Sequence, residues 1–71
     1  MTYTMISRNE SGEFKQRWYV DTVIEKAIEI SKYMFIDNSI HVQIYEDRVP
    51  KGDFYGKPVA VVKKNGEVIY G

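Results

Sequence analysis

The chain has 71 residues, of which 44% are hydrophobic and 28% charged, and its ten basic and ten acidic residues give a formal net charge of zero. This length predicts one small globular domain over residues 1–71, near the size at which a single core is only just sufficient. The ordinary composition argues against disorder. The zero net charge argues against a strong sequence-independent hold on nucleic acid.

The composition also bears on the compartment. No cysteine is present, which excludes disulfides and thiolate metal sites and agrees with a reducing environment. The apolar runs are far too short to cross a bilayer. The first residues, MTYTMISRNE, lack the basic and then apolar pattern of a secretory signal. We therefore expect a cytoplasmic protein.

The first alternating segment spans residues 2–8, TYTMISR, and is rich in residues that favour strands. Its period of two divides the side chains between two faces, with Tyr3 and Met5 on one and Thr4 and Ile6 on the other. The sequence NESG that follows is typical of a turn. We expect a strand that ends in a short connection.

Residues 13–19, EFKQRWY, alternate again and predict the second strand of a hairpin. The pattern assigns its side chains to two faces, Phe14, Gln16 and Trp18 against Lys15, Arg17 and Tyr19. An alternative interpretation extends the following helix backward through residues 16–19. The β-rich composition and a helix cap at Thr22 favour the hairpin.

The helix is predicted over residues 22–35, TVIEKAIEISKYMF. At 100° per residue its apolar side chains fall within an arc of roughly 160°, formed by Val23, Ile24, Ala27, Ile28, Ile30, Met34 and Phe35. Thr22 and Glu25 have the spacing of a capping box. Asn38 tolerates the left-handed conformation that often ends a helix. The outer arc mixes lysine and glutamate with Tyr33.

Residues 39–46, SIHVQIYE, predict the clearest strand of the chain. Its apolar face is Ile40, Val42 and Ile44, and its polar and aromatic face is His41, Gln43 and Tyr45. Residues 57–64, KPVAVVKK, contain a continuous apolar run that favours a central strand. Asn65-Gly66 is the strongest signal for a two-residue hairpin turn, so residues 67–70 are expected to return as a short last strand.

These elements predict an α+β fold with a single antiparallel sheet of four to five strands and one helix packed on one face, in the order ββαββ(β). One helix covers one face of such a sheet. The other face is expected to keep polar and aromatic residues, namely Lys15, Arg17, His41, Gln43 and Tyr45. The pattern leaves open which face of the first hairpin is buried.

No motif predicts an enzyme. The single histidine, His41, has neither a nucleophile nor an orienting third group beside it in the pattern, so we interpret it as a solvated residue of the open sheet face. The acidic residues of the loop 46–57 lack the alternate spacing of a calcium loop. The glycines match neither phosphate-binding motif. We expect no catalytic residue, no metal site and no cofactor.

The loop 46–57 is long for a hairpin connection and carries two rings between glycines, Phe54 and Tyr55. Aromatic anchors of this kind are typical centres of protein interfaces. We therefore predict a partner-binding set made of Asp53, Phe54, Tyr55, Tyr45 and His41. The alternative is that the two rings fold back and cover one end of the small core.

Basic residues interleaved with rings favour a second function, the binding of single-stranded nucleic acid on an open sheet. The candidates are Lys15, Arg17, Trp18, His41 and Tyr45. The competing interpretation is that lysine and arginine protect an exposed strand from aggregation. The zero net charge favours that interpretation.

In its arrangement the whole chain resembles small ββαββ single-sheet domains encoded by bacteria and their phages. Its short length, missing cysteine and many tyrosines are also similar to small phage accessory proteins. That resemblance implies a regulatory protein that binds a host protein, and it implies no particular site residue. An exposed sheet edge would in addition allow a homodimer.

Overall fold

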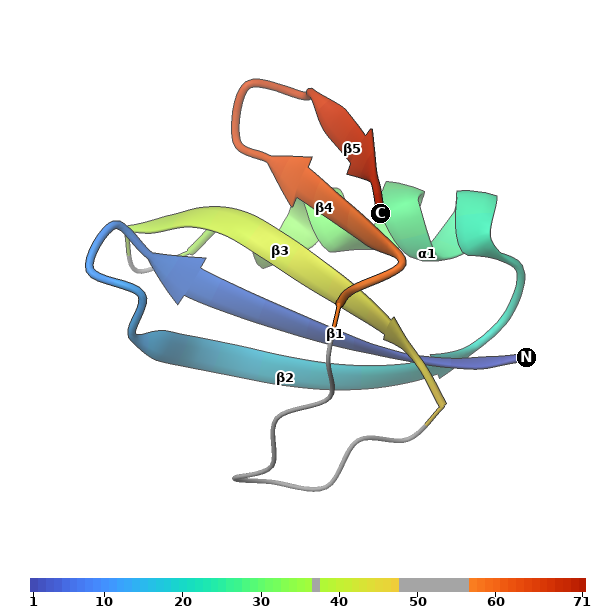
Figure 1. Ribbon diagram of the computed structural model, residues 1–71. Helices are drawn as coiled ribbons and strands as arrows, with labels where there is room; N and C mark the ends of the chain where they lie inside the picture. Colours follow the sequence, from blue (N-terminus) through green and yellow to red (C-terminus); the bar gives the residue numbers. More distant parts are fainter. Residues whose placement is uncertain (37, 48–56) are drawn as a thin grey trace.

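The structure is a computed structural model that describes residues 1–36, 38–47 and 57–71. These residues form one antiparallel sheet and one helix (Figure 1). The elements are β1 (Thr2–Asn9), β2 (Phe14–Asp21), α1 (Ile24–Ser31), the 3-10 turn η1 (Lys32–Met34), β3 (Ser39–Glu46), β4 (Ala60–Lys63) and β5 (Val68–Tyr70). The five strands lie in the order β2-β1-β3-β4-β5. The predicted α+β fold is confirmed, and the last strand pairs.

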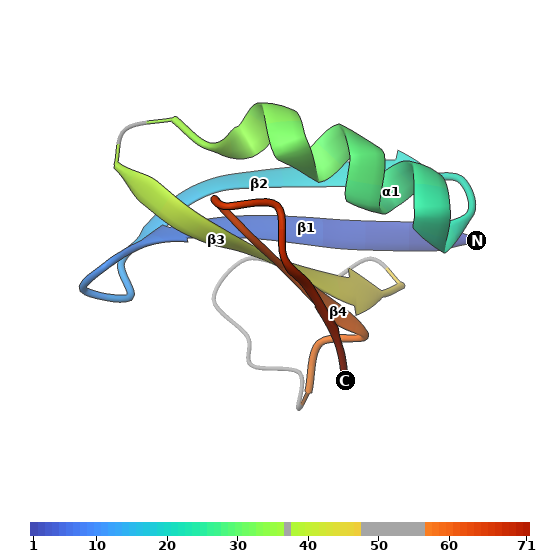
Figure 2. The same cartoon turned by 90° about the horizontal axis from the view of Figure 1, so that it is seen from above.

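The helix connects β2 to β3, and β1 lies between these two strands in the sheet. The chain leaves β2 at the sheet edge, runs back as α1 over one face, and enters β3 on the far side of β1 (Figure 2). All neighbouring strands are antiparallel. The strand β4 is an interior strand, as its apolar run predicted, although the middle position belongs to β3.

The core lies between α1 and the three strands beneath it, β1, β3 and β4. Its buried apolar side chains are Tyr3, Met5, Ala27, Ile28, Met34, Val42, Ile44, Ala60 and Val62. Trp18, Val20 and Val68 pack against it from the flanking strands. The face of the first hairpin that the sequence left open is thereby assigned: Tyr3, Met5 and Trp18 face the helix.

The helix begins later than predicted. Its N-cap is Val23, which makes no side-chain cap hydrogen bond, so the capping box of Thr22 and Glu25 does not form. The backbone N–H of Thr22 donates instead to the carbonyl of Met1 at 2.8 Å, which prolongs the pairing of β2 with β1. The backbone at Thr22 therefore belongs to the sheet and not to a helix cap. Val23, which was predicted to belong to the apolar arc of the helix, is 61% exposed.

The helix also ends earlier. The α-helical part stops at Ser31, and η1 continues it for one tight turn to Met34. Asn38 adopts the expected left-handed conformation with φ of 66°. The N–H of Ser39 donates to the carbonyl of Ile36 at 2.9 Å, so this turn leads directly into β3.

A bulge in β3 overturns the expected position of Ile40 in the core. Arg8 pairs with His41 while Asn9 pairs with Ser39, so Ile40 is the extra residue and is 39% exposed. A bulge adds one unpaired residue and breaks the alternation of side chains. Val42 and Ile44 beyond it are fully buried, as predicted.

A second bulge overturns the expected face of Phe14. Ser7 pairs with Gln16 while Arg8 pairs with Phe14, so Lys15 is the extra residue in β2. Phe14 thereby lies across from Arg8, on the opposite side of the sheet from Trp18. The alternation over residues 13–19 had assigned Phe14 and Trp18 to one face.

Both tight hairpins use a three-residue connection, so the predicted two-residue turn at Asn65-Gly66 is wrong. The Gly66 N–H donates to the carbonyl of Lys63 at 2.9 Å, and the N–H of Lys63 donates to the carbonyl of Glu67 at 2.8 Å. Gly66 has φ of 95°, and Gly12 has φ of 85° in the matching β1–β2 turn. A turn followed by one left-handed residue is the common three-residue hairpin.

Candidate binding surface

The face of the sheet opposite α1 carries most of the side chains that can recognise a partner, and we call it the open face. The strand register arranges it in rows that cross the sheet. Three rows are Tyr19, Thr4 and Tyr45; Arg17, Ile6, Gln43, Val61 and Ile69; and Phe14, Arg8, His41 and Lys63, and a further pair at one end is Asp21 and Thr2. Cations and rings from four different strands thus share one surface.

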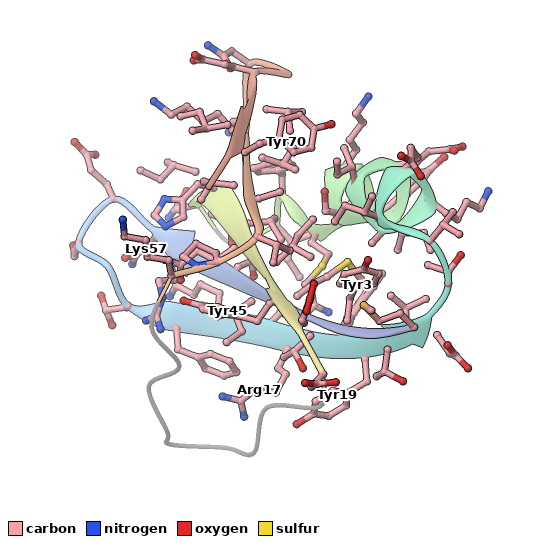
Figure 3. All side chains as sticks on the ribbon, turned by 45° about the vertical axis from the view of Figure 1, so that its right-hand side comes forward. Tyr3, Arg17, Tyr19, Tyr45, Lys57 and Tyr70 are labelled. Atoms are coloured by element: carbon pink, nitrogen blue, oxygen red, sulfur yellow. The ribbon has the colours of Figure 1, made fainter. Side chains whose placement is uncertain are left out.

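Arg17 is placed over a ring. Its Cζ atom lies 5.0 Å from the centroid of Phe14, within the range of a cation–π contact. The Nε atom of Arg17 is buried and has no hydrogen-bond partner in the part of the chain that the structure describes. Figure 3 shows Arg17 and Tyr19 on the side of the sheet away from α1. The position of the guanidinium is therefore set by its contact with the Phe14 ring and not by a hydrogen bond from Nε.

Arg8 is a fixed cation near the end of β1 on the open face. Its Nε donates to Oε1 of Gln43 at 2.8 Å, and its Nη1 donates to the carbonyl of Gly12 at 3.0 Å. These bonds tie β1 to β3 and to the first hairpin turn. A guanidinium held on two sides loses little conformational entropy when it binds an anion.

His41 lies between Arg8 and Lys63 in the third row. Burial lowers its pKa below the ordinary 6.5, and the positive charges of Arg8 and Lys63 lower it further. The imidazole is therefore neutral at pH 7. The sequence predicted a solvated residue on the open sheet face, and His41 lies on that face but is half-buried. An anionic ligand beside it would reverse the effect of the two cations.

The carboxylates near this face lie at its ends. Asp21 is bonded to the N-terminal ammonium at 3.2 Å, at the end of β2. Glu67 lies 4.0 Å from the Nζ atom of Lys63, beyond the end of β4. Among the described strand positions, no aspartate or glutamate stands within the three rows. The interior of the open face is consequently basic, although the whole chain is neutral.

An apolar floor lies between the cations. Ile6 is only 3% exposed although it is on the open face, and Ile69 at the far edge is 42% exposed. Phe14 and Tyr19 are 45% and 39% exposed, and Tyr45 is half-buried. Thr4 lies between these two tyrosines, and its hydroxyl donates to the carbonyl of Asp47 at 2.7 Å. The face therefore combines accessible rings with buried aliphatic groups.

Three of the predicted site residues, Arg17, His41 and Tyr45, share the open face. Trp18 does not, because it faces the helix and packs against the core, so its place in the predicted nucleic-acid set is corrected. Lys15 is exposed at the bulge of the edge strand β2.

The loop candidates Asp53, Phe54 and Tyr55 lie outside the described residues, and their role stays a prediction. The site also contains residues that the sequence reasoning did not select, Arg8 and Phe14. Arg8 is an even-numbered residue of the first strand, as Thr4 and Ile6 are, so the alternation of the sequence already indicated that these three side chains share a face. The face of Phe14 could not be predicted, because the bulge at Lys15 has no signal in the sequence.

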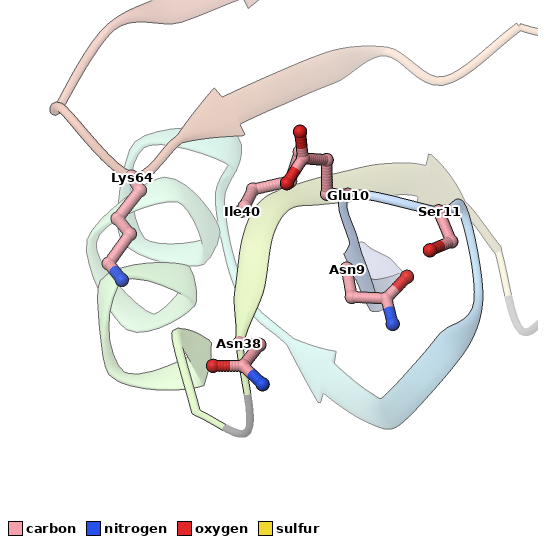
Figure 4. A pocket seen from close by; sticks show the side chains of 6 residues that line it. All are labelled: Asn9, Glu10, Ser11, Asn38, Ile40 and Lys64. Carbon is pink, nitrogen blue, oxygen red and sulfur yellow. The ribbon is translucent and has the colours of Figure 1, made fainter.

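A separate polar groove of about 380 Å³ lies at one end of the sheet (Figure 4). It is lined by Asn9, Glu10, Ser11, Asn38, Ile40 and Lys64. These residues come from the first hairpin turn, the entry to β3 and the last hairpin turn. Glu10 and Lys64 are its charged residues, so it has little of the convergent chemistry of an active site.

Across residues 1–36, 38–47 and 57–71, no three histidine, aspartate or glutamate side chains gather so that they can hold a metal ion. None of the helices within these ranges has the length and apolar character needed to cross a membrane. Comparison of the chain with protein-family models, with curated proteins and with solved structures finds no match.

Proposed function

We propose that this protein is a non-enzymatic binding protein that recognises an acidic partner through the open face of its sheet. The observation that carries the proposal is the segregation of charge: cations and rings fill the rows, and carboxylates lie at the ends. Arginine and tyrosine are also the residues that contribute most at recognition surfaces. A partner with negative charge complements this surface.

The chemistry of the described residues supports binding over catalysis. His41 has a lowered pKa, but its titratable or charged neighbours are the cations Arg8 and Lys63. A general base normally works beside a nucleophile or a carboxylate that orients it. The two cations beside His41 would attract an anion, and a bound anion would raise the pKa of the imidazole again.

The regulatory role, the phage or mobile-element origin, the host-factor partner and the cytoplasmic location stay predictions from the sequence. So does the homodimer. The sheet has two edges, of which β2 is eight residues long and β5 is three. The longer edge, β2, offers more backbone groups for pairing with a second copy. Light scattering across a range of protein concentrations tests this prediction directly.

The proposed function can be tested by retention on immobilised heparin, a generic polyanion. Arg17→Glu and Lys32→Glu change the net charge equally, but Lys32 is exposed on the helical side of the molecule. We expect Arg17→Glu to elute at clearly lower salt than Lys32→Glu, because only Arg17 stands on the open face. Circular dichroism establishes that both variants fold, and Lys63→Gln provides a second open-face variant that is exposed.

Equal elution of the two variants would contradict the proposal, since retention would then follow net charge alone. Earlier elution of Lys32→Glu would place the recognition surface on the helical side.

A further inference from the structure

We infer that the open face binds single-stranded nucleic acid, with bases on its rings and phosphates beside its cations. The inference rests on the proposed function of this face and names its partner class. The rings are Phe14, Tyr19 and Tyr45, and the cations are Arg8, Arg17 and Lys63.

The spacing of the rings suits separate bases. Tyr19 and Tyr45 pair with Thr4 from opposite sides, so two strand spacings of about 4.8 Å set them about 10 Å apart. Phe14 pairs with Arg8, four residues from Thr4 along β1, which is about 13 Å. Stacked bases of one strand repeat every 3.4 Å or so. Each ring would therefore receive a different, unstacked base.

Arg17 adds a stacking surface of its own. Its guanidinium already lies 5.0 Å from the centroid of the Phe14 ring. A base can stack on an arginine plane as it does on an aromatic ring, and the positive charge also attracts the adjacent phosphate.

The shape of the face favours a single strand over a duplex. Sequence reading in a duplex needs a helix or a protruding ribbon that enters the major groove. The described part of the open face is the broad side of a five-stranded sheet, with the one helix on the other side. A duplex hides the flat faces of its bases, so the rings of this sheet could not stack on them. A single strand leaves those faces accessible.

The apolar floor separates this ligand from a purely ionic one. In the second row, Ile6, Gln43 and Val61 lie between Arg17 at one edge of the sheet and Ile69 at the other. An acidic peptide would present carboxylates but few flat apolar groups to this floor. Bases and sugars can contact the rings and also the exposed Ile69 side chain, so they use more of the surface.

The experiment is a fluorescence anisotropy titration at low salt with a labelled single-stranded DNA and a labelled RNA of about 16 nucleotides, the upper range of sites on small binding domains. A duplex of the same DNA sequence and a poly-glutamate peptide serve as competitors. We expect both single strands to bind, and the duplex and the peptide to compete at least about tenfold less well. The tighter of the two single strands identifies RNA or DNA as the preferred ligand.

Ring variants test the stacking. Phe14→Leu and Tyr45→Leu keep an apolar side chain and remove the ring, and each should weaken binding about tenfold, the order reported by alanine substitution at stacked bases. Tyr33→Leu is the matched control, because Tyr33 is a ring on the helical side that is 75% exposed. That control should bind as the native protein does.

Salt dependence tests the phosphate contacts. Three neutralised phosphates predict a slope of about −2 in log affinity against log salt, since each contributes about −0.7 on a single strand. Arg17→Gln should make this slope shallower by about 0.7 and Lys32→Gln should leave it unchanged.

Three results would overturn the inference. The first is no binding of either single strand while heparin retention still depends on Arg17, which would leave the proposed function intact and assign the face to an acidic protein. The second is competition by duplex or peptide as strong as by single strands. The third is an equal loss of affinity in Tyr33→Leu and in the two open-face ring variants.

Discussion

The two sides of β3 show how one strand serves two purposes. Its helix-facing residues, Val42 and Ile44, are fully buried in the core. Its open-face residues, His41, Gln43 and Tyr45, are half-buried and lie among arginines and rings. The backbone is the same, so the difference comes entirely from which alternate residue is apolar. Side-chain parity thus separates the buried core from the surface to which we assign recognition.

The largest expected effect tests the stability side of this comparison. Ile44→Ala removes a fully buried side chain and should lower the free energy of unfolding by about 2–5 kcal/mol. Ile69→Ala on the open face, where the side chain is 42% exposed, should cost under about 1 kcal/mol. Urea denaturation followed by circular dichroism measures both. Equal costs would mean that the two sides are not divided in this way.

An intermediate effect concerns the hairpin turns, which belong to neither side. Gly66 has φ of 95° and open space where a Cβ would stand, so Gly66→Ala meets only backbone strain. We expect a loss of about 1–2 kcal/mol in the free energy of unfolding. Gly66→Asn should lose less, because asparagine tolerates the left-handed region. A cost of Gly66→Asn equal to that of Gly66→Ala would show that the strain argument is wrong for this turn.

The smallest expected effect separates the two roles of the open face through pH. The folded protein holds the pKa of His41 below 6.5, by burial and by the charges of Arg8 and Lys63. The unfolded chain therefore binds a proton more readily below 6.5, and stability falls as the pH is lowered from that value. His41→Gln should remove this component. The change is measured as the difference in urea midpoint between the two proteins at neutral and mildly acidic pH.

Ligand binding should show the opposite trend with pH. A bound phosphate near His41 favours the protonated imidazole, so affinity for a single strand should rise as the pH falls, and His41→Gln should abolish the rise. An affinity independent of pH in the native protein would place the phosphates away from the third row.

The sequence predicted much of this fold because alternation and helical period are local signals. Residues 2–8 and 39–46 carry the faces they were assigned, except at Ile40. The two bulges were not predictable, since they depend on the hydrogen-bond register between strands distant in the chain. The failed cap at Thr22 has the same cause, because its N–H is taken by Met1.

The candidate site was predicted in part for related reasons. The parity of His41 and Tyr45 was sufficient to place them on one face, and the strand register adds Arg17 to them. Trp18 was grouped with them because its neighbours in sequence are basic, yet neighbours along a strand point to opposite faces. The length of the last hairpin turn could not be fixed either, since Asn65-Gly66 occurs in two-residue and three-residue connections.

The central claim is that recognition belongs to the open face. Its most direct test is a titration of isotopically labelled protein with the single-stranded oligonucleotide, followed by amide and side-chain chemical shifts. We expect the largest changes in chemical shift at Arg8, Arg17, His41 and Tyr45. The chemical shifts of Lys32 and Tyr33 on the helical side should stay unchanged. Shifts concentrated on α1 and η1, or spread evenly over both sides of the sheet, would contradict it.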